Sequence, residues 1–140
     1  MALYVRILSP SEKVPDRSSV SFLLQVARFE GTVTYEDGGD EHAWTQMVFT
    51  HADGTPIAWI DVDPVKPGSL AALEIQGFCD QIAHAKPWRS ARWLADYLRK
   101  VRMIYAVRIM DGAYGNLGRQ AVNAITKGIH LHVGGILQVD

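Results

Sequence analysis

Two pairs of residues are spaced so that their side chains could bind a metal ion or catalyse hydrolysis. On a strand, His130 and His132 would point the same way, so that both imidazoles could reach one ion. Asp61 and Asp63 share this spacing, and paired carboxylates can bind a hard cation or act as acid and base. These residues, with His51 as a further base, predict one alternative function: a small metal-dependent or acid–base hydrolase.

The same side chains have simpler explanations, and we favour those. No third or fourth ligand stands at a matching spacing, so His130 and His132 are expected to be ordinary, partly exposed histidines near a helix end. Asp63 precedes Pro64 and is expected to end a strand, with Asp61 on the solvated side of that strand. No G-x-S-x-G nucleophile sequence is present. The sequence therefore predicts neither a metal nor a cofactor.

Acidic and basic residues are divided along the chain. Between Arg28 and Lys66 there are eight acidic residues and no lysine or arginine. From Lys86 to Arg108 there are seven basic residues and one acid, a division that the formal net charge of -1 hides. Separated fields of opposite sign attract and steer partners of opposite charge. The negative charges of the acidic segment could be neutralised by the basic segment of the same chain or by a basic partner.

The leading prediction is a non-enzymatic protein-binding module. Within that class we expect a bacterial immunity-type inhibitor, which neutralises a basic toxin such as a nuclease by covering its active site. Small size, cytosolic character and an acidic surface favour this function, and such pairs can be tight and steered by charge. The predicted partner-binding residues are the acids Glu36, Asp37, Asp40, Glu41, Asp61 and Asp63, with Trp44 as an aromatic anchor. A third alternative is a structural or regulatory subunit that dimerises through an exposed sheet edge.

Composition narrows the class of protein. The 140 residues are 48% hydrophobic, which predicts a single domain, 1–140, with a core that needs no metal or disulfide. The single cysteine, Cys79, fits a reducing, cytoplasmic compartment, and no signal peptide is visible. The pI of about 6.5 argues against a dedicated nucleic-acid binder, and no window approaches the roughly 20 apolar residues of a membrane helix. We expect a monomer or homodimer. The chain stops within an apolar run, so it is either complete or part of a longer protein.

Hydrophobic periodicity predicts an α+β domain in the order β-α-β-β-β-α-α-β-α-β. A mainly antiparallel sheet of about six strands is expected, with helices packed on one face. The expected strands are 3–8, 32–35, 44–50, 56–62, 103–110 and 133–139. The expected helices run from 16–19 to about 31, from 69 to about 83, from 88 to about 100 and from 116 to about 128. Segment 20–26 could also be a strand, although helix is preferred. Asp53-Gly54 predicts the turn of a hairpin.

The two middle helices are each expected to bury one apolar stripe. The stripe of the first comprises Leu70, Leu73, Gly77 or Phe78, and Ile82. The stripe of the second comprises Trp93, Leu94, Tyr97, Leu98 and Val101.

Overall fold

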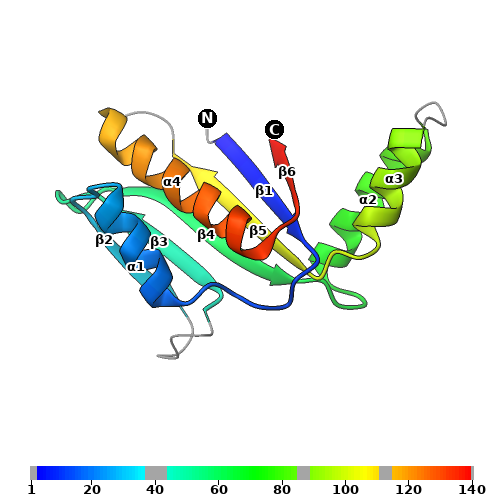
Figure 1. Ribbon diagram of the computed structural model, residues 1–140, viewed down its shortest axis with the longest axis horizontal. Coiled ribbons are helices and arrows are strands. Elements are labelled where there is room, and N and C mark those ends of the chain that lie inside the picture. Colours follow the sequence, from blue (N-terminus) through cyan, green and yellow to red (C-terminus); the bar gives the residue numbers. More distant parts are fainter. Residues whose placement is uncertain (1–2, 37–43, 85–88, 111–114, 140) are drawn as a thin grey trace.

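The computed structural model describes residues 3–36, 44–84, 89–110 and 115–139, and these form one six-stranded sheet with four helices (Figure 1). The strand order is β2-β3-β4-β5-β1-β6, and every neighbouring pair is antiparallel. In chain order the elements are β1 (Leu3–Ser9), α1 (Arg17–Val26), β2 (Thr32–Glu36), β3 (Gln46–Thr50), β4 (Pro56–Pro64), α2 (Leu70–Ala83), α3 (Arg89–Leu98), β5 (Met103–Ile109), α4 (Gly115–Val133) and β6 (Ile136–Val139). The predicted α+β class and element order are confirmed.

Helices α1 and α4 cover one face of the sheet, which we call the covered face (Figure 1). Val20 of α1 and Ile129 of α4 are buried against strand residues such as Ile7 and Tyr105. Because side chains alternate along a strand, every second residue of β1 and β5 points into this core. The main hydrophobic core therefore lies between the sheet and these two helices.

Helices α2 and α3 form an arm that packs at one end of the opposite face. Ile75 of α2 and Leu98 of α3 are buried with Leu8 and Ile104. Leu8 directly follows Ile7 of the main core, and Ile104 directly precedes Tyr105 of that core. Because side chains alternate along a strand, Leu8 and Ile104 point to the other side of the sheet. The expectation that the helices pack on one face thus holds for α1 and α4, whereas the arm lies against the opposite face.

The hairpin of β3 and β4 and the first helix follow the sequence closely. Gly54 has a φ of 92°, and the Thr55 N–H donates to Asp53 Oδ1 at 2.9 Å, a bond that lowers the pKa of Asp53. Segment 20–26 is helical, as preferred. The helix ends at Val26 rather than near Gly31, which instead passes so close to the Thr50 carbonyl that a Cβ would lie 1.9 Å from that oxygen.

The last helix is longer than predicted. It continues through Gly128 to Val133, because Gly128 is a packing position and not a helix end. A Cβ there would lie 2.3 Å from Leu23 Cδ1, so glycine lets α1 and α4 approach closely. The helix stops at Gly134, whose φ is 69° and whose N–H donates to the His130 carbonyl at 2.8 Å.

The buried stripes of the arm agree with the predicted ones in part. The predicted residues that do pack in the cluster of the arm are Phe78, Ile82, Leu94, Tyr97, Leu98 and Val101. Leu70 and Leu73 are exposed, whereas Ala71 and Ile75 are buried. On α3 the predicted Leu98 is buried, but Trp93 is exposed, and its ring is tilted against that of Tyr97 with the centroids 5.5 Å apart. The reason is the narrow contact area: α2 and α3 face each other and a short part of the sheet, so that residues one position away from this contact remain in solvent.

Candidate functional site

The side of the sheet opposite α1 and α4, beyond the arm, is the candidate site, and we call it the open face. Within the described ranges, the arm is the helical part that packs on this side. The strand registers place its side chains in two adjacent rows. The first row is Glu36, Gln46, Asp61, Ala106, Arg6 and Gln138, and the second is Thr34, Val48, Trp59, Arg108 and Tyr4. Most of these residues are half-buried, as expected for a face without a helical layer.

Three carboxylates gather where the open face meets α2, and we call them the acid cluster: Asp61, Asp63 and Glu74. Asp61 accepts a hydrogen bond of 2.6 Å from Gln46 Nε2. Burial, together with the charges of Asp61 and Glu74, raises the pKa of Asp63 above its ordinary value. Arg6 forms an ion pair with Glu74. Burial is the largest cause of the raised pKa of Asp63, and repulsion from the two neighbouring carboxylates adds to it.

An aromatic and guanidinium row runs beside the acid cluster. Trp59, Arg108 and Tyr4 are direct neighbours on β4, β5 and β1. The guanidinium carbon of Arg108 lies 4.6 Å from the Trp59 ring centroid, a cation–π contact. Its Nε is buried with no hydrogen-bond partner among the described residues. Trp, Tyr and Arg are the residue types enriched at binding hot spots, so this row is suited to anchoring a partner.

The row was missed at the sequence level, although a signal was present. Trp59 stands between Ala58 and Ile60, which are buried in the covered face. Strand alternation therefore requires Trp59 to share a side with Asp61. Recognising Arg108 as its neighbour needed the pairing of β4 with β5, which the sequence did not specify.

The predicted partner-binding residues divide into three groups. Glu36, Asp61 and Asp63 lie on the open face. Three loop acids lie outside the described residues: Asp37, Asp40 and Glu41. Trp44 is only 2% exposed, and its Nε1 donates to the Pro15 carbonyl oxygen at 2.8 Å. Trp44 is thus a core residue, which removes it from the predicted docking surface as an anchor.

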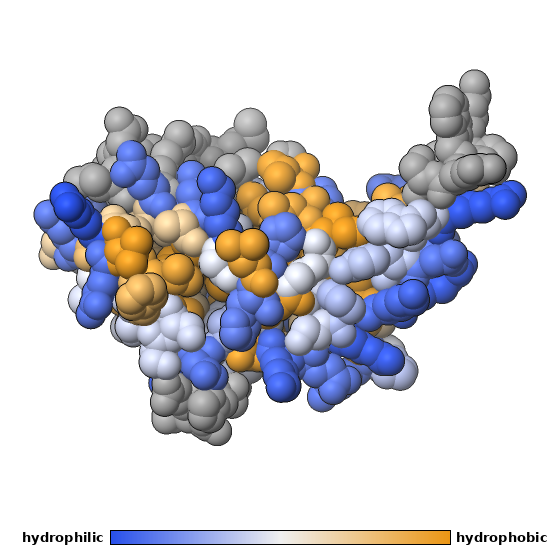
Figure 2. Space-filling model, in the orientation of Figure 1, coloured by the Kyte–Doolittle hydropathy of each residue, from blue (hydrophilic) through white to orange (hydrophobic). Residues whose placement is uncertain are grey.

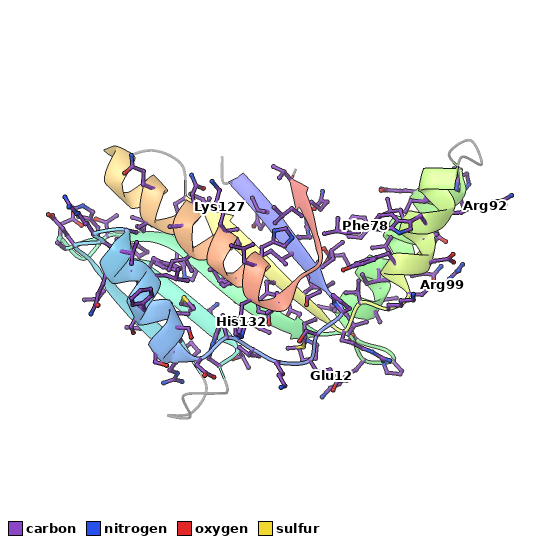
Figure 3. All side chains as sticks on the ribbon, in the orientation of Figure 1. Glu12, Phe78, Arg92, Arg99, Lys127 and His132 are labelled. Atoms are coloured by element: carbon purple, nitrogen blue, oxygen red, sulfur yellow. The ribbon has the colours of Figure 1, made fainter. Side chains whose placement is uncertain are left out.

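Two described cations of the arm, Arg92 and Arg99, do not cover the acid cluster. Arg92 and Arg99 point to the outer side of α3, away from the sheet (Figure 3). Arg99 forms an ion pair with Asp96 of its own helix at 2.9 Å. The cations placed on the open face by strand register are Arg6 and Arg108. Among the described side chains, two guanidinium groups therefore stand on this side with four carboxylates: those of the acid cluster and Glu36.

The residues of the predicted hydrolase do not come together. His130 and His132 lie on α4 instead of a strand, so they point in directions about 200° apart around the helix. His130 Nε2 is 2.8 Å from the Gly135 carbonyl oxygen. His51 lies at the β3–β4 turn, where its Nδ1 is 3.4 Å from Asp53 Oδ1. In the part of the chain that the structure describes, no group of three or more His, Cys, Asp or Glu residues could hold a metal ion.

Comparisons with known protein families, with curated proteins and with solved structures find no match to this chain. Across the described ranges, none of the helices has the length and apolar character required to span a membrane. The functional argument therefore depends on the open face itself.

Proposed function

We propose that this chain is a non-enzymatic protein-binding module that docks a basic protein on its open face. One observation carries the proposal: the acid cluster lies beside the Trp59–Arg108–Tyr4 row on a side of the sheet where the described helices leave it uncovered. The acids supply charge, and the row supplies apolar and aromatic contact area. Together these are the two components of a steered, anchored interface.

Electrostatics favours a cationic partner. The pKa of Asp63 is raised chiefly by burial, and the negative charges of Asp61 and Glu74 raise it further. A lysine or arginine from a partner would relieve the repulsion among Asp61, Asp63 and Glu74. It would also form charge-assisted hydrogen bonds, which are stronger than neutral ones. Binding of a basic surface is therefore favoured over binding of a polyanion such as nucleic acid.

The finer proposal is a bacterial, cytoplasmic immunity-type inhibitor. A basic toxin, for example a nuclease, needs cationic residues to hold its own substrate. An inhibitor that presents carboxylates on a firm sheet face can cover those residues and block the active site. The division of charge along the sequence and the small size of the chain support this assignment.

The docking surface is tested with a cationic probe, a fluorescein-labelled peptide of alternating arginine and glycine. The variant Asp61→Asn/Asp63→Asn/Glu74→Gln is expected to bind it about tenfold more weakly. Three exposed charge contacts of about 0.5 kcal/mol each give a total close to that factor. Fluorescence anisotropy titrations measure the affinity. The wild-type affinity should fall as salt is added, because exposed charges are screened beyond about 10 Å at 0.1 M ionic strength.

A matched control separates location from net charge. Glu12, Asp53 and Asp96 are exposed acids outside the acid cluster. The variant Glu12→Gln/Asp53→Asn/Asp96→Asn removes the same number of charges and is expected to keep nearly the wild-type affinity. Equal losses in the two triple variants would mean that the peptide senses only overall charge, and the open face would then lose its role.

The inhibitor assignment is tested with the products of the adjoining genes. We expect one of them to be a basic protein that stops growth when expressed alone and is harmless when co-expressed with this chain. The acid-cluster variant should fail to protect. A toxic product that is neutralised equally well by that variant would contradict docking through these carboxylates.

A further inference from the structure

Strand β6 is a short edge of the described sheet that carries neither of two common protective residue types, a charge or a proline. It is the last strand in the order, and its residues Ile136–Val139 include neither a charge nor a proline. Leu137 is 42% exposed and Val139 is 61% exposed. Natural edge strands usually carry charges, prolines or bulges that prevent pairing with another chain. The opposite edge, β2, exposes polar side chains instead: Thr32, Thr34 and Glu36.

An apolar cleft of about 250 Å³ opens between β6 and the arm. Ile136 and Leu137 line it from the strand, and Phe78, Ile82 and Leu94 line it from the arm. Phe78 points from the arm toward β6 (Figure 3), and the two elements diverge around this gap (Figure 1). In Figure 2 apolar side chains gather beside this gap. An added strand would therefore meet both a backbone edge and an apolar wall.

We propose that the occupant of this edge is β6 of a second copy of the chain. Antiparallel pairing centred on Gln138 places Leu137 opposite Val139 of the second copy, and the two-fold axis repeats that contact. The most exposed apolar side chains of the edge thus cover each other, and the two Gln138 amides meet on the other side of the sheet. No charge in β6 opposes the pairing, and the formal net charge of -1 gives little repulsion between copies.

The arm supplies the remainder of the interface. A specific interface buries at least about 1,200 Å² in total, more than two four-residue strands provide. Phe78, Ile82 and Leu94 extend the apolar contact beyond the strand edge. A second copy therefore binds by strand addition, with the arms covering the paired strands from the open face. The strand pairing itself uses side chains of the covered side, because Leu137 and Val139 point there, whereas the basic partner docks on the open face.

Another apolar surface provides the rival location for a dimer. A groove of about 560 Å³ lies between α1 and α4, and Phe22, Leu23 and Leu131 line it. It offers no backbone edge for pairing, so we place the contact at β6. A test of the dimer must distinguish these two surfaces.

Light scattering after size exclusion tests the proposal with the full chain. The wild type should have about twice the monomer mass of 15.5 kDa. Val139→Lys places a charge at the paired edge and should return the mass to that of a monomer. Phe22→Lys is a matched control, because Phe22 is 65% exposed on α1 and lines the rival groove. It should remain a dimer, and far-UV circular dichroism checks that both variants are folded.

A second measurement needs no variant. Amide protons of 136–139 should exchange more slowly at high than at low protein concentration, because pairing protects them. A wild type that stays monomeric at all concentrations overturns the proposal, as does a dimer that survives Val139→Lys. Loss of the dimer in Phe22→Lys alone would assign the contact to the groove between α1 and α4, which Phe22 lines.

Discussion

A single glycine fixes how β6 joins the sheet. Gly135 has a φ of 114°, a conformation that side chains with a Cβ rarely adopt. A Cβ at this position would lie 2.2 Å from the Leu8 carbonyl oxygen, which belongs to the backbone and cannot turn aside. Its neighbour Gly134 also has a positive φ, of 69°, but a Cβ there would meet nothing within 4 Å. A comparison of substitutions at these two glycines thus separates the cost of backbone strain from the cost of a steric clash.

Gly135→Ala should therefore destabilise the protein more than Gly134→Ala. For Gly134→Ala we expect a loss of about 1–2 kcal/mol, the cost of a left-handed conformation for an ordinary residue. For Gly135→Ala we expect about 2–4 kcal/mol, because overpacking against the backbone adds to the strain. Urea denaturation followed by circular dichroism measures both free energies of unfolding. Equal losses would show that the approach to Leu8 relaxes without cost.

Residue roles on the sheet could be predicted only where alternation decides them. The sequence placed Asp61 and Asp63 together on one side of a strand, and both lie on the same side of β4 in the structure. Trp44 was predicted to be an exposed anchor, yet it lies in the core because its ring packs between Tyr35 and Tyr105. Trp59, two residues before Asp61, takes a half-buried position on the open face instead. An aromatic residue next to acidic loops does not reveal its own burial, since that depends on partners far away in sequence.

At the scale of elements, hydrophobic periodicity predicted which helices and strands exist and their order, but not which side of each helix is buried. All ten elements occur in the predicted order. The arm shows the limit of the method, since α2 has apolar residues on more than one side. Leu70 and Leu73 form one candidate stripe, and Ala71 and Ile75 form another. Contact with Leu8 and Ile104, both remote in sequence, selects the second stripe.

The orientation of α2 is tested by two truncations on one helix. Ile75→Ala should lower the free energy of unfolding by about 2–3 kcal/mol, because it opens a cavity in the cluster of the arm. Leu73→Ala should change it by less than about 0.5 kcal/mol, because Leu73 is exposed. Chemical denaturation of both variants provides the comparison. The reverse ranking would mean that Leu73, not Ile75, faces the sheet.

For the whole molecule, function follows from how the helices are distributed over the sheet. Two helices close one face, and the other two occupy only the end of the opposite face. The sheet order brings β1 between β5 and β6, so residues from both ends of the chain contribute to the open face. Such long-range pairing cannot be derived from local periodicity. This explains why Asp61 and Asp63 were identified from the sequence, whereas Glu74 of α2 and the Trp59–Arg108–Tyr4 row were not.

The two proposed surfaces should act independently, although one side chain touches both. Arg6 pairs with Glu74 in the acid cluster, and its Nη1 donates to Gln138 Oε1 of β6 at 2.9 Å. Changes at separate sites usually add to within about 0.5 kcal/mol, roughly a factor of two in affinity. Val139→Lys should therefore bind the arginine peptide within about twofold of wild type. The triple acid-cluster variant should keep the mass of a dimer. A larger change in either cross-measurement would show that Arg6 couples pairing at β6 to the charge of the open face, and the two surfaces would then form one interface.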